Sequence, residues 1–456
     1  MKEIIKPVNE QEAIEMLHRY NEDLLPQKFG MAGKLWVTIL CLVIAIGLYN
    51  YFWQLKLGLT VTGLSDTVSW GIYISNFVFF VAVSLVGSLI TAILNLLNVS
   101  WRAPITRISE IIAVSGIMFA GLIIIVDMGR PDRILNMFLH GRIQSPIVWD
   151  VIVVMTYMTI SLLFLIFPLL PGIAFCRDRM TNIPKWQHKM YKILSFGWTN
   201  KKAQYEIVVK AIKILSVLII PVALSIHTVT SWLFATTYRP GWDSTNFGAY
   251  FVAGAFMVGA AAVIAGMFII RKFYNRYDEY ITDKHFDRMG RMLVLLSFVY
   301  LYFTVNEYFI PGYKMKGDEG EHLKELFVGH YAPMFWMVQI FGMIIPILVL
   351  LFPKGRKPVP IFIMAVFVII GAWFKRYLIV IPTMLHPFLP LQQIPEASKH
   401  YSATFAEWSI TGASLAGALL VITLFIRYFP IISIWELAEE RGVPHDTIYE
   451  HLNEKE

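Results

Sequence analysis

The sequence predicts an all-α protein that crosses a membrane ten times. The 456 residues are 57% hydrophobic and only 16% charged, whereas soluble domains carry about 25% charged residues. The hydrophobic residues also form uninterrupted runs of roughly 18 residues or more, which is the length that a helix needs to cross a bilayer. No polar linker separates these runs, so a soluble multidomain protein is excluded.

The apolar runs also predict how the spans group. Span two opens with WGIY and span six with FGAY. Spans four apart run in the same direction, so we expect two parallel-repeated four-helix bundles, residues 68–235 and 244–383, with the first and tenth spans peripheral. The expected spans are 34–53, 68–98, 107–127, 147–172, 206–235, 244–271, 290–311, 326–352, 358–383 and 405–429.

Loop charges predict the orientation. The N-terminal segment and the loops on its side of the membrane hold 23 Lys and Arg residues, and the opposite loops hold 9. Positively charged loops stay in the cytoplasm, so the end segments 1–33 and 430–456 are expected there. Because the basic residues lie in loops, the net charge of +7 indicates contact with lipid headgroups and not with nucleic acid.

The N-terminal segment predicts a surface helix. Asn9 and Glu12 have the spacing of a capping box, and the stretch EAIEMLHRYNEDLL is amphipathic. Such a helix docks on a partner or lies in solvent.

The sequence predicts no redox group held by this chain. Its two cysteines, Cys41 and Cys176, lie far apart and form no CxxC, so neither an iron–sulfur cluster nor a c-type haem is expected. A b-type haem needs paired histidines deep in facing helices, and only His227 is a candidate. We therefore expect no haem, metal or iron–sulfur cluster in this chain.

Ionisable residues gather near the outer ends of the spans, and the inner layer lacks them at depth. Each such charge costs about 2.5–3.5 kcal/mol at the bilayer centre, so the layer suggests a proton-exchanging site. Snorkelling at helix ends is the alternative, and it suits Arg130 and Arg239. The residues of the layer are Asp127, Asp150, His227, Asp243, Glu307, His330 and Arg376.

Quinol oxidation is the proton chemistry that fits a lipid-facing pocket. A quinol releases two protons and two electrons, and each hydroxyl needs a base within hydrogen-bonding reach. His140 lies ten residues before Asp150 across a loop with Gly and Pro, and a folded-back loop would place the imidazole above the carboxylate. Alternatively, Asp150 caps its helix and His140 lies among headgroups. Aromatic candidates for the ring site are Tyr73, Trp149 and Trp232.

Three motifs resemble the NrfD/PsrC family of integral membrane quinol-interacting subunits. They are DMGRPDR (Asp127 to Arg133), SPIVWD (Ser145 to Asp150) and SIHTVTSW (Ser225 to Trp232). Within that family, a chain with ten spans resembles the ActC and ActF subunits of bacterial alternative complex III. The resemblance implies that quinol is oxidised in the first bundle near the outer face, with a pocket formed by Asp127, Arg130, His140, Asp150 and His227.

The resemblance also implies partners and a location. Electrons would pass to an outer-face iron–sulfur subunit and then to multi-haem cytochrome c subunits, beside a second NrfD-like membrane subunit and a terminal oxidase. The protein would lie in the bacterial inner membrane, with quinol or quinone as its bound substrate and with protons released outside.

The second bundle departs from the family pattern. Span seven ends in NEYFIP where span three ends in DMGRP. We therefore expect no second quinone site there. Glu307 and Arg376 would serve proton movement together with Asp243 and His330, or would pair with each other.

Two other functions fit part of the pattern. A secondary transporter would suit repeated bundles, but polar groups on one face leave no substrate site at mid-membrane. The other is a membrane anchor or quinone subunit of a polysulfide or molybdopterin-type reductase, which the sequence does not separate from a quinol-oxidising subunit.

Overall fold

The computed structural model describes residues 9–180, 182–237, 239–386 and 400–444. These residues form helices, turns and loops without a strand, and ten helical segments are long and apolar enough to cross a membrane. The predicted all-α polytopic fold is therefore confirmed.

The observed spans follow the expected order. The first combines α2 (Met31–Leu57) with the short helix η1 (Gly58–Val61), and the eighth runs through α12 (Ala332–Gln339), a π-helix η4 (Ile340–Ile344) and α13 (Ile345–Leu351). The others are α3 (Ile72–Leu96), α4 (Ala103–Asp127), α6 (Pro146–Arg179), α8 (Lys202–Ala235), α9 (Phe247–Phe273), α10 (Asp283–Lys314), α14 (Pro358–Met384) and α15 (Phe405–Tyr428).

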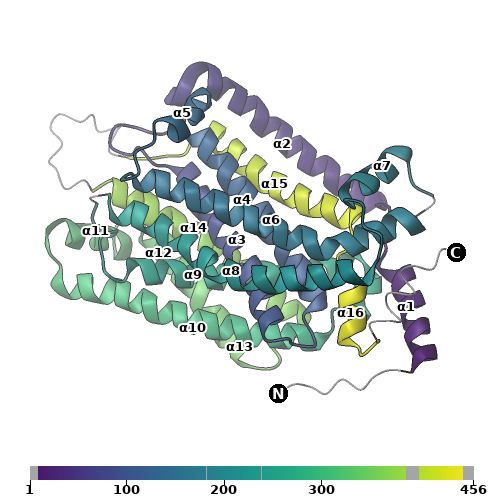
Figure 1. The fold of residues 1–456 in the computed structure, drawn as a ribbon. Coiled ribbons are helices and arrows are strands. Elements are labelled where there is room, and N and C mark those ends of the chain that lie inside the picture. Colours follow the sequence, from purple (N-terminus) through teal and green to yellow (C-terminus); the bar gives the residue numbers. More distant parts are fainter. Residues whose placement is uncertain (1–8, 181, 238, 387–399, 445–456) are drawn as a thin grey trace.

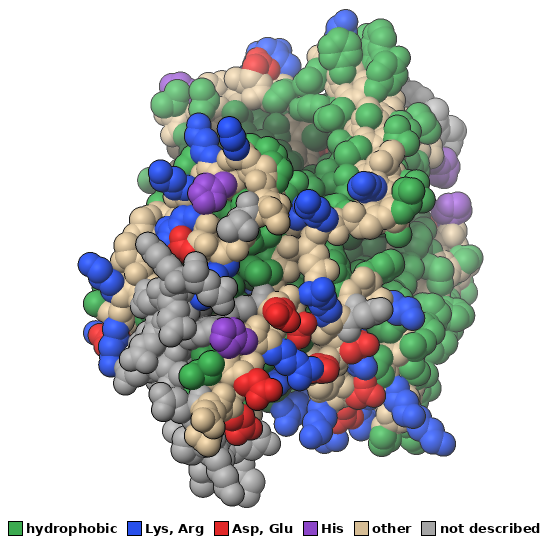
Figure 2. All heavy atoms as spheres, turned by 90° about the vertical axis from the view of Figure 1, so that its right-hand side faces the viewer, with side chains coloured by type: hydrophobic (Ala, Val, Ile, Leu, Met, Phe, Trp, Pro, Cys, Tyr) green, Lys and Arg blue, Asp and Glu red, His purple; other side chains and the backbone are tan. Residues whose placement is uncertain are grey.

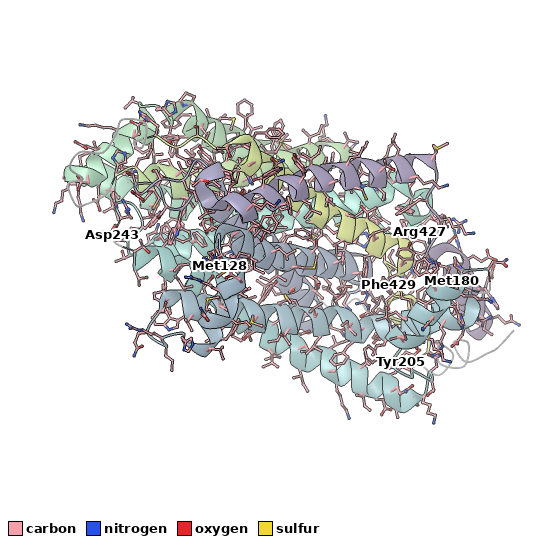
Figure 3. The ribbon with its side chains drawn as sticks, turned by 90° about the horizontal axis from the view of Figure 1, so that it is seen from above. Met128, Met180, Tyr205, Asp243, Arg427 and Phe429 are labelled. Carbon is pink, nitrogen blue, oxygen red and sulfur yellow. The ribbon has the colours of Figure 1, made fainter. Side chains whose placement is uncertain are left out.

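Short helices mark the two ends of the molecule (Figure 1). We call the end with α1, α7 and α16 the terminal end, and the end with α5 and α11 the distal end. Figure 3 shows Met128 and Asp243 toward the distal end, and Met180 and Arg427 toward the terminal end. The short helices are α1 (Glu10–Leu24), η2 (Pro131–Arg133), α5 (Ile134–Leu139), α7 (Lys185–Leu194), η3 (Asn275–Glu279), α11 (Gly317–Phe327) and α16 (Ile434–Glu440).

Helix contacts divide the spans into two groups. In the first, α3 packs against α4 and α8, and α6 packs against the same two helices. In the second, α9 packs against α10 and α14, with the eighth span between those two. Contacts of α3 with α9 and α14 join the groups, while α2 and α15 pack together beside α4. The repeat between the groups and its boundaries remain proposals.

The centre of the molecule is α3, because small residues let neighbouring backbones approach it. A Cβ atom at Gly87 would lie 2.1 Å from the backbone oxygen of Ser109 on α4, so glycine permits this contact, as small residues do at membrane helix interfaces. In contrast, α2 exposes most of its apolar side chains.

The predicted N-terminal helix forms, but its surroundings differ from both expectations. Asn9 makes no side-chain capping bond, so the predicted capping box is wrong. Leu17 and Tyr20 are buried, α1 contacts α16, and the hydroxyl of Tyr280 donates to Asp23 at 2.9 Å. The helix therefore docks on its own chain. Residues 1–8 and 445–456 of the predicted end segments lie outside the described residues.

Two further expectations need correction. The eighth span begins at Ala332 and not at 326, because α11 ends at Phe327 as a separate amphipathic helix. The terminal end also holds buried charges that the sequence did not predict. Arg107 of α4 donates to Glu110 at 2.7 Å and lies 3.5 Å from Glu436 of α16. Figure 2 shows this end of the molecule, where Lys and Arg side chains are numerous.

Candidate functional site

The first candidate group lies between α6 and α8, toward the distal end. Asp150 of α6 is only 3% exposed, and its carboxylate accepts a hydrogen bond of 2.6 Å from the hydroxyl of Thr230. His227 lies almost one helical turn before Thr230 on α8, so both side chains share one face. Asp150 therefore does not cap its helix but points to a neighbouring span.

His227 has hydrogen-bonding capacity to spare. It is fully buried, and neither ring nitrogen has a hydrogen-bond partner in the described structure. Its ring lies 5.8 Å from that of Phe251 on α9. Buried polar atoms in proteins usually have partners, so these nitrogens indicate a place where water or a ligand binds.

The outer surface of the same helices faces the lipid region. Trp232 of α8 is 50% exposed, and Ile152 of α6 is exposed as well. Asp150 thus lies directly behind an apolar surface. Trp232 points toward that surface and does not line the buried group, whereas the indole N–H of Trp149 donates to the backbone oxygen of Ile143.

A second group of candidates lies where α2, α3 and α4 meet. The buried hydroxyl of Tyr73 donates to Gln54 at 2.8 Å, and Gln54 donates to the backbone oxygen of Val126 at 2.9 Å. One carboxylate oxygen of Asp127 is buried there without a partner. The hydrogen-bond partners of Tyr73 thus come from α2, whereas the partner of Asp150 comes from α8.

Two predicted site residues lie on the distal surface. His140 is exposed at the end of α5, and no hydrogen bond joins it to Asp150, whose partner is Thr230. Arg130 donates twice to Asp132, at 3.0 and 2.9 Å, and this pairing lowers the pKa of Asp132. Joining His140 to Asp150 would require a movement of the loop between α5 and α6, so the pair remains a hypothesis.

In the second bundle, two donors bind the carboxylate of Glu307. The hydroxyl of Ser244 lies 2.9 and 2.8 Å from its two oxygens and donates its one proton there, and the amide of Asn246 donates at 3.0 Å. Arg376 is not among its hydrogen-bond or ion-pair partners in the described structure, so the predicted alternative that Glu307 pairs with Arg376 is wrong. Arg376 instead lies over the ring of Phe251, 5.2 Å from its centre.

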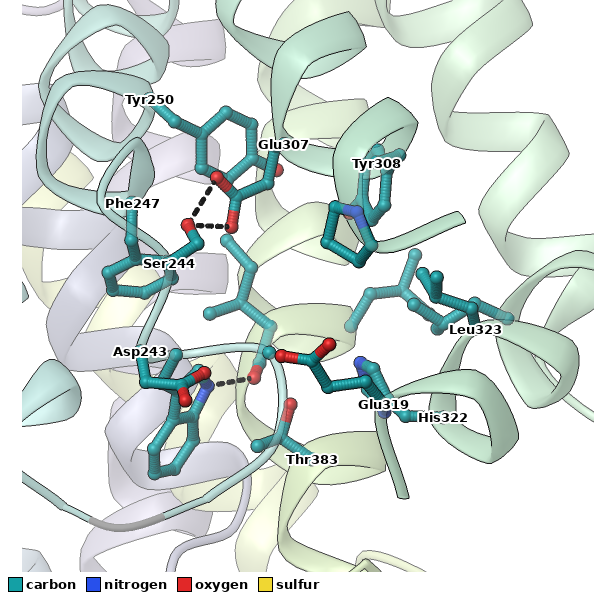
Figure 4. A pocket seen from close by; sticks show the side chains of 16 residues that line it. Asp243, Ser244, Phe247, Tyr250, Glu307, Tyr308, Glu319, His322, Leu323 and Thr383 are labelled. Carbon is teal, nitrogen blue, oxygen red and sulfur yellow. Dashed lines mark hydrogen bonds between the residues drawn. The ribbon is translucent and has the colours of Figure 1, made fainter. Parts of the chain in front are cut away.

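Glu307 opens into a distal pocket between α9, α10, α11 and α14 (Figure 4). Asp243 and Glu319 make its wall acidic, and the aromatic rings of Phe247 and Tyr250 make it partly apolar. His322 lies beside Glu319 in the figure. Burial, and to a lesser degree the nearby His386, lowers the pKa of His322 to about 3. His330 is exposed and lies outside this lining.

Sequence reasoning missed several residues of these groups. Thr230 stands in the quoted SIHTVTSW, three residues after His227, so helical spacing was the signal. Lys375 directly precedes Arg376 in an apolar run. Charged residues within spans are rare and usually functional, so the argument that selected Arg376 applies to Lys375 as well. No local signal marks Gln54 or Ser244, because their partners come from other helices.

The described residues offer no metal centre, since no three His, Cys, Asp or Glu side chains are grouped to hold an ion. Cys41 is exposed and Cys176 is buried, and both are free thiols. That this chain carries no haem or cluster remains a prediction.

Residues 60–387 match the family described as polysulphide reductase, NrfD. The chain belongs to this family. The match covers the spans that contain Asp150, His227 and the distal pocket. The NrfD resemblance predicted from DMGRPDR, SPIVWD and SIHTVTSW is therefore confirmed.

Relatives of this NrfD chain are named as subunits of reductases and of a menaquinol oxidoreductase. It is 26% identical to a putative dimethyl sulfoxide reductase membrane subunit of Halobacterium salinarum, over 76% of each chain. It is 23% identical to a selenate reductase subunit of Mesobacillus selenatarsenatis, over 92% of this chain and 99% of that one. An Hdr-like menaquinol oxidoreductase integral membrane subunit of Archaeoglobus fulgidus is 22% identical, over 89% of this chain and 95% of the relative.

Proposed function

We propose that this chain is the quinol-binding membrane subunit of a multi-subunit oxidoreductase and that quinol is oxidised between α6 and α8. The observation that supports the proposal most is the buried Asp150, held by Thr230 three residues after His227, whose ring nitrogens have no partner in the described structure. A carboxylate and an imidazole are the bases that accept protons from two hydroxyls. The NrfD assignment and the names of the relatives favour this function over a secondary transporter.

The geometry suggests how the headgroup is held. We place the entry of the quinol at the exposed apolar side chains Ile152 and Trp232, and its headgroup at the buried side chains Asp150 and His227 of the same two helices. The neutral imidazole accepts a proton from one hydroxyl, and Asp150 accepts from the other or orients the ring. His140 would join from above if its loop closes over α6.

Thr230 can form a hydrogen bond with Asp150 in both protonation states of the carboxyl group. Its hydroxyl has one proton and lies 2.6 Å from Asp150 and 2.8 Å from the backbone oxygen of Ile226. The hydroxyl donates to the carboxylate when Asp150 is ionised. When Asp150 holds a proton, it donates to Thr230, whose own proton turns to Ile226. A proton can thus arrive without leaving a buried group unsatisfied.

The proposed complex has two forms. In the alternative complex III form, electrons pass to an outer-face iron–sulfur subunit and to multi-haem cytochromes c, beside a second NrfD-like subunit and a terminal oxidase. In the other form, they pass to a polysulfide or molybdopterin-type reductase. A relative named as a menaquinol oxidoreductase subunit favours the first form. Relatives named as subunits of dimethyl sulfoxide and selenate reductases favour the second form to the same degree.

We further propose that the distal end faces outward from the bacterial inner membrane and that released protons leave there. The acidic pocket with Asp243 and Glu307 is the proposed outlet. Gln144 and Asn182 are exposed on opposite sides of the spans. In intact cells, an impermeant thiol reagent should label Gln144→Cys and spare Asn182→Cys. The reverse pattern would invert the orientation.

The proposed function is tested by purifying the chain with its partners. The complex should contain extractable quinone, and added menaquinol or ubiquinol should drive reduction of its acceptor. Cytochrome c as acceptor would identify the alternative complex III form, and an oxyanion or polysulfide would identify the reductase form. Acceptor reduction that does not depend on quinol would contradict the function.

A further inference from the structure

A second cavity lies inside the second bundle and is lined by donors. It lies between α9, α10, α14 and the eighth span, and its volume is about 10 Å³, which is room for one particle of roughly the size of a water molecule. The polar side chains that line it are Tyr300, Gln339, Lys375 and Arg376. No acidic side chain is among its lining residues.

Two of the three guanidinium nitrogens of Arg376 lack a hydrogen-bond partner beside this cavity. The side chain is 1% exposed, and its Nε and Nη2 atoms are buried without a partner in the described structure. An arginine keeps its charge in proteins, so it cannot relieve burial by losing a proton. A buried charge therefore needs a counter-charge and acceptors.

Arg376 has no paired carboxylate beside the cavity. Glu307 is the acidic group that acts on the neighbouring Lys375, and its carboxylate accepts from Ser244 and Asn246. Lys375 donates to the hydroxyl of Tyr308 at 2.6 Å. No residue that lines the cavity therefore neutralises the guanidinium charge of Arg376.

Gln339 adds a donor from the opposite wall. The side chain is 7% exposed, and its Nε2 atom is buried without a partner. Gln339 immediately precedes the π-helix η4, and single π-helical turns within α-helices are frequent at functional sites. A Cβ atom at Gly371 would lie 2.6 Å from the Cα atom of Gly342. This close approach presses η4 onto α14 and brings Gln339 and Arg376 to the same cavity.

We propose that this cavity binds a small monovalent anion of the chloride class, held by the guanidinium of Arg376 and the amide of Gln339. The anion balances the charge of Arg376 and accepts from the unpartnered donors. It also ties the π-helical turn of the eighth span to α14. The cavity is separate from the proposed quinol site between α6 and α8, although the charge of Arg376 also acts on His227.

The experiment measures stability of the assembled complex in chloride and in gluconate at constant ionic strength. Cys176 is buried, so its labelling on heating, quantified by mass spectrometry, reports unfolding of this chain alone. We expect chloride and bromide to raise the unfolding midpoint saturably, by roughly 2–4 °C well above the dissociation constant.

Two variants and one control locate the effect. Arg376→Gln should abolish the anion dependence, and Gln339→Leu should raise the half-saturating chloride concentration about tenfold, as loss of one charge-assisted hydrogen bond does. Arg142→Gln, an exposed arginine on the distal surface, should keep the full response. If Arg376→Gln does not fold, the chloride response of Gln339→Leu decides whether the anion binds in this cavity.

Equal midpoints in chloride and gluconate for the natural chain would overturn the proposal and indicate that water fills the cavity. An unchanged chloride response in both Arg376→Gln and Gln339→Leu would also overturn it.

Discussion

Both bundles bury a carboxylate near the distal end, and both bind it to a hydroxyl of a neighbouring segment. Asp150 accepts one hydrogen bond from Thr230, whose proton is shared with a backbone oxygen. Glu307 accepts from Ser244 and from the amide of Asn246. The partner of the first carboxylate, Thr230, lies three residues after His227, whose two ring nitrogens have no partner in the described structure, and the second carboxylate lies at an acidic pocket.

The difference between the two is hydrogen-bonding capacity. Two donors bind Glu307 and one binds Asp150, so Glu307 has less capacity left to bind a substrate hydroxyl. Both ring nitrogens of His227 are without a partner in the described structure. A buried polar group with unused capacity indicates a ligand more strongly than burial or charge alone. We therefore place substrate chemistry in the first bundle and proton exit in the second.

Exchanging each carboxylate for its amide tests this assignment most severely. Asp150→Asn keeps the shape but loses the base, so quinol oxidation by the purified complex should fall about 10²-fold. Glu307→Gln should lower it less than about tenfold, because Glu307 does not contact the substrate. Asp178→Asn, an exposed carboxylate at the other end of α6, is the matched control and should leave the rate unchanged.

The comparison fails if Glu307→Gln is the more damaging change while both complexes retain their partner subunits. Near-normal turnover in Asp150→Asn together with a strong loss in His140→Ala would instead show that the loop histidine is the base.

The sequence predicted the ten spans and the layer of ionisable groups because both are local properties. Apolar length marks a span, and Asp150 and His227 stand out within such runs. What it could not predict is which of them meet. His140 and Asp150 are close in sequence but do not meet in the structure, whereas Thr230 lies 80 residues from Asp150 and binds it.

Substitution of His227 should have a smaller effect than substitution of Asp150. His227→Leu removes one acceptor for the headgroup, so the KM for quinol should rise about tenfold, the value of a hydrogen bond of about 1.4 kcal/mol. His227→Gln should show a smaller rise, because its amide oxygen still accepts. Steady-state kinetics with the purified complex measures both. An unchanged KM in both variants would remove His227 from the quinol site.

The sequence did not predict the buried charges at the terminal end because, as with the Asp150–Thr230 hydrogen bond, their partners are distant in the sequence. Arg107 and Glu110 stand at the start of the predicted third span and resemble loop residues in sequence. Packing of other helices around α4 buries them, and α16, more than 300 residues later, supplies Glu436. Long-range packing therefore decides which charges become interior.

The smallest expected effect concerns His322 in the distal pocket. Burial lowers its pKa from 6.5 to about 3, so between these values the unfolded chain binds a proton that the folded chain does not. Stability should therefore fall as the pH drops below 6.5, by about 1 kcal/mol at one unit lower. Thermal unfolding of His322→Gln should show a flatter dependence between about pH 7.5 and about pH 5.5. An identical dependence would show that His322 is protonated in the folded protein.

The most direct test of the central claim is the position of the quinol headgroup. An azido-quinone can be photoactivated in the purified complex, and the labelled peptides of this chain can be identified by mass spectrometry. The account predicts labels on α6 and α8 near Asp150 and His227, and competition by unlabelled quinol should remove them. Competed labels confined to the distal pocket of α9, α10 and α11 would contradict it and assign quinol chemistry to the second bundle.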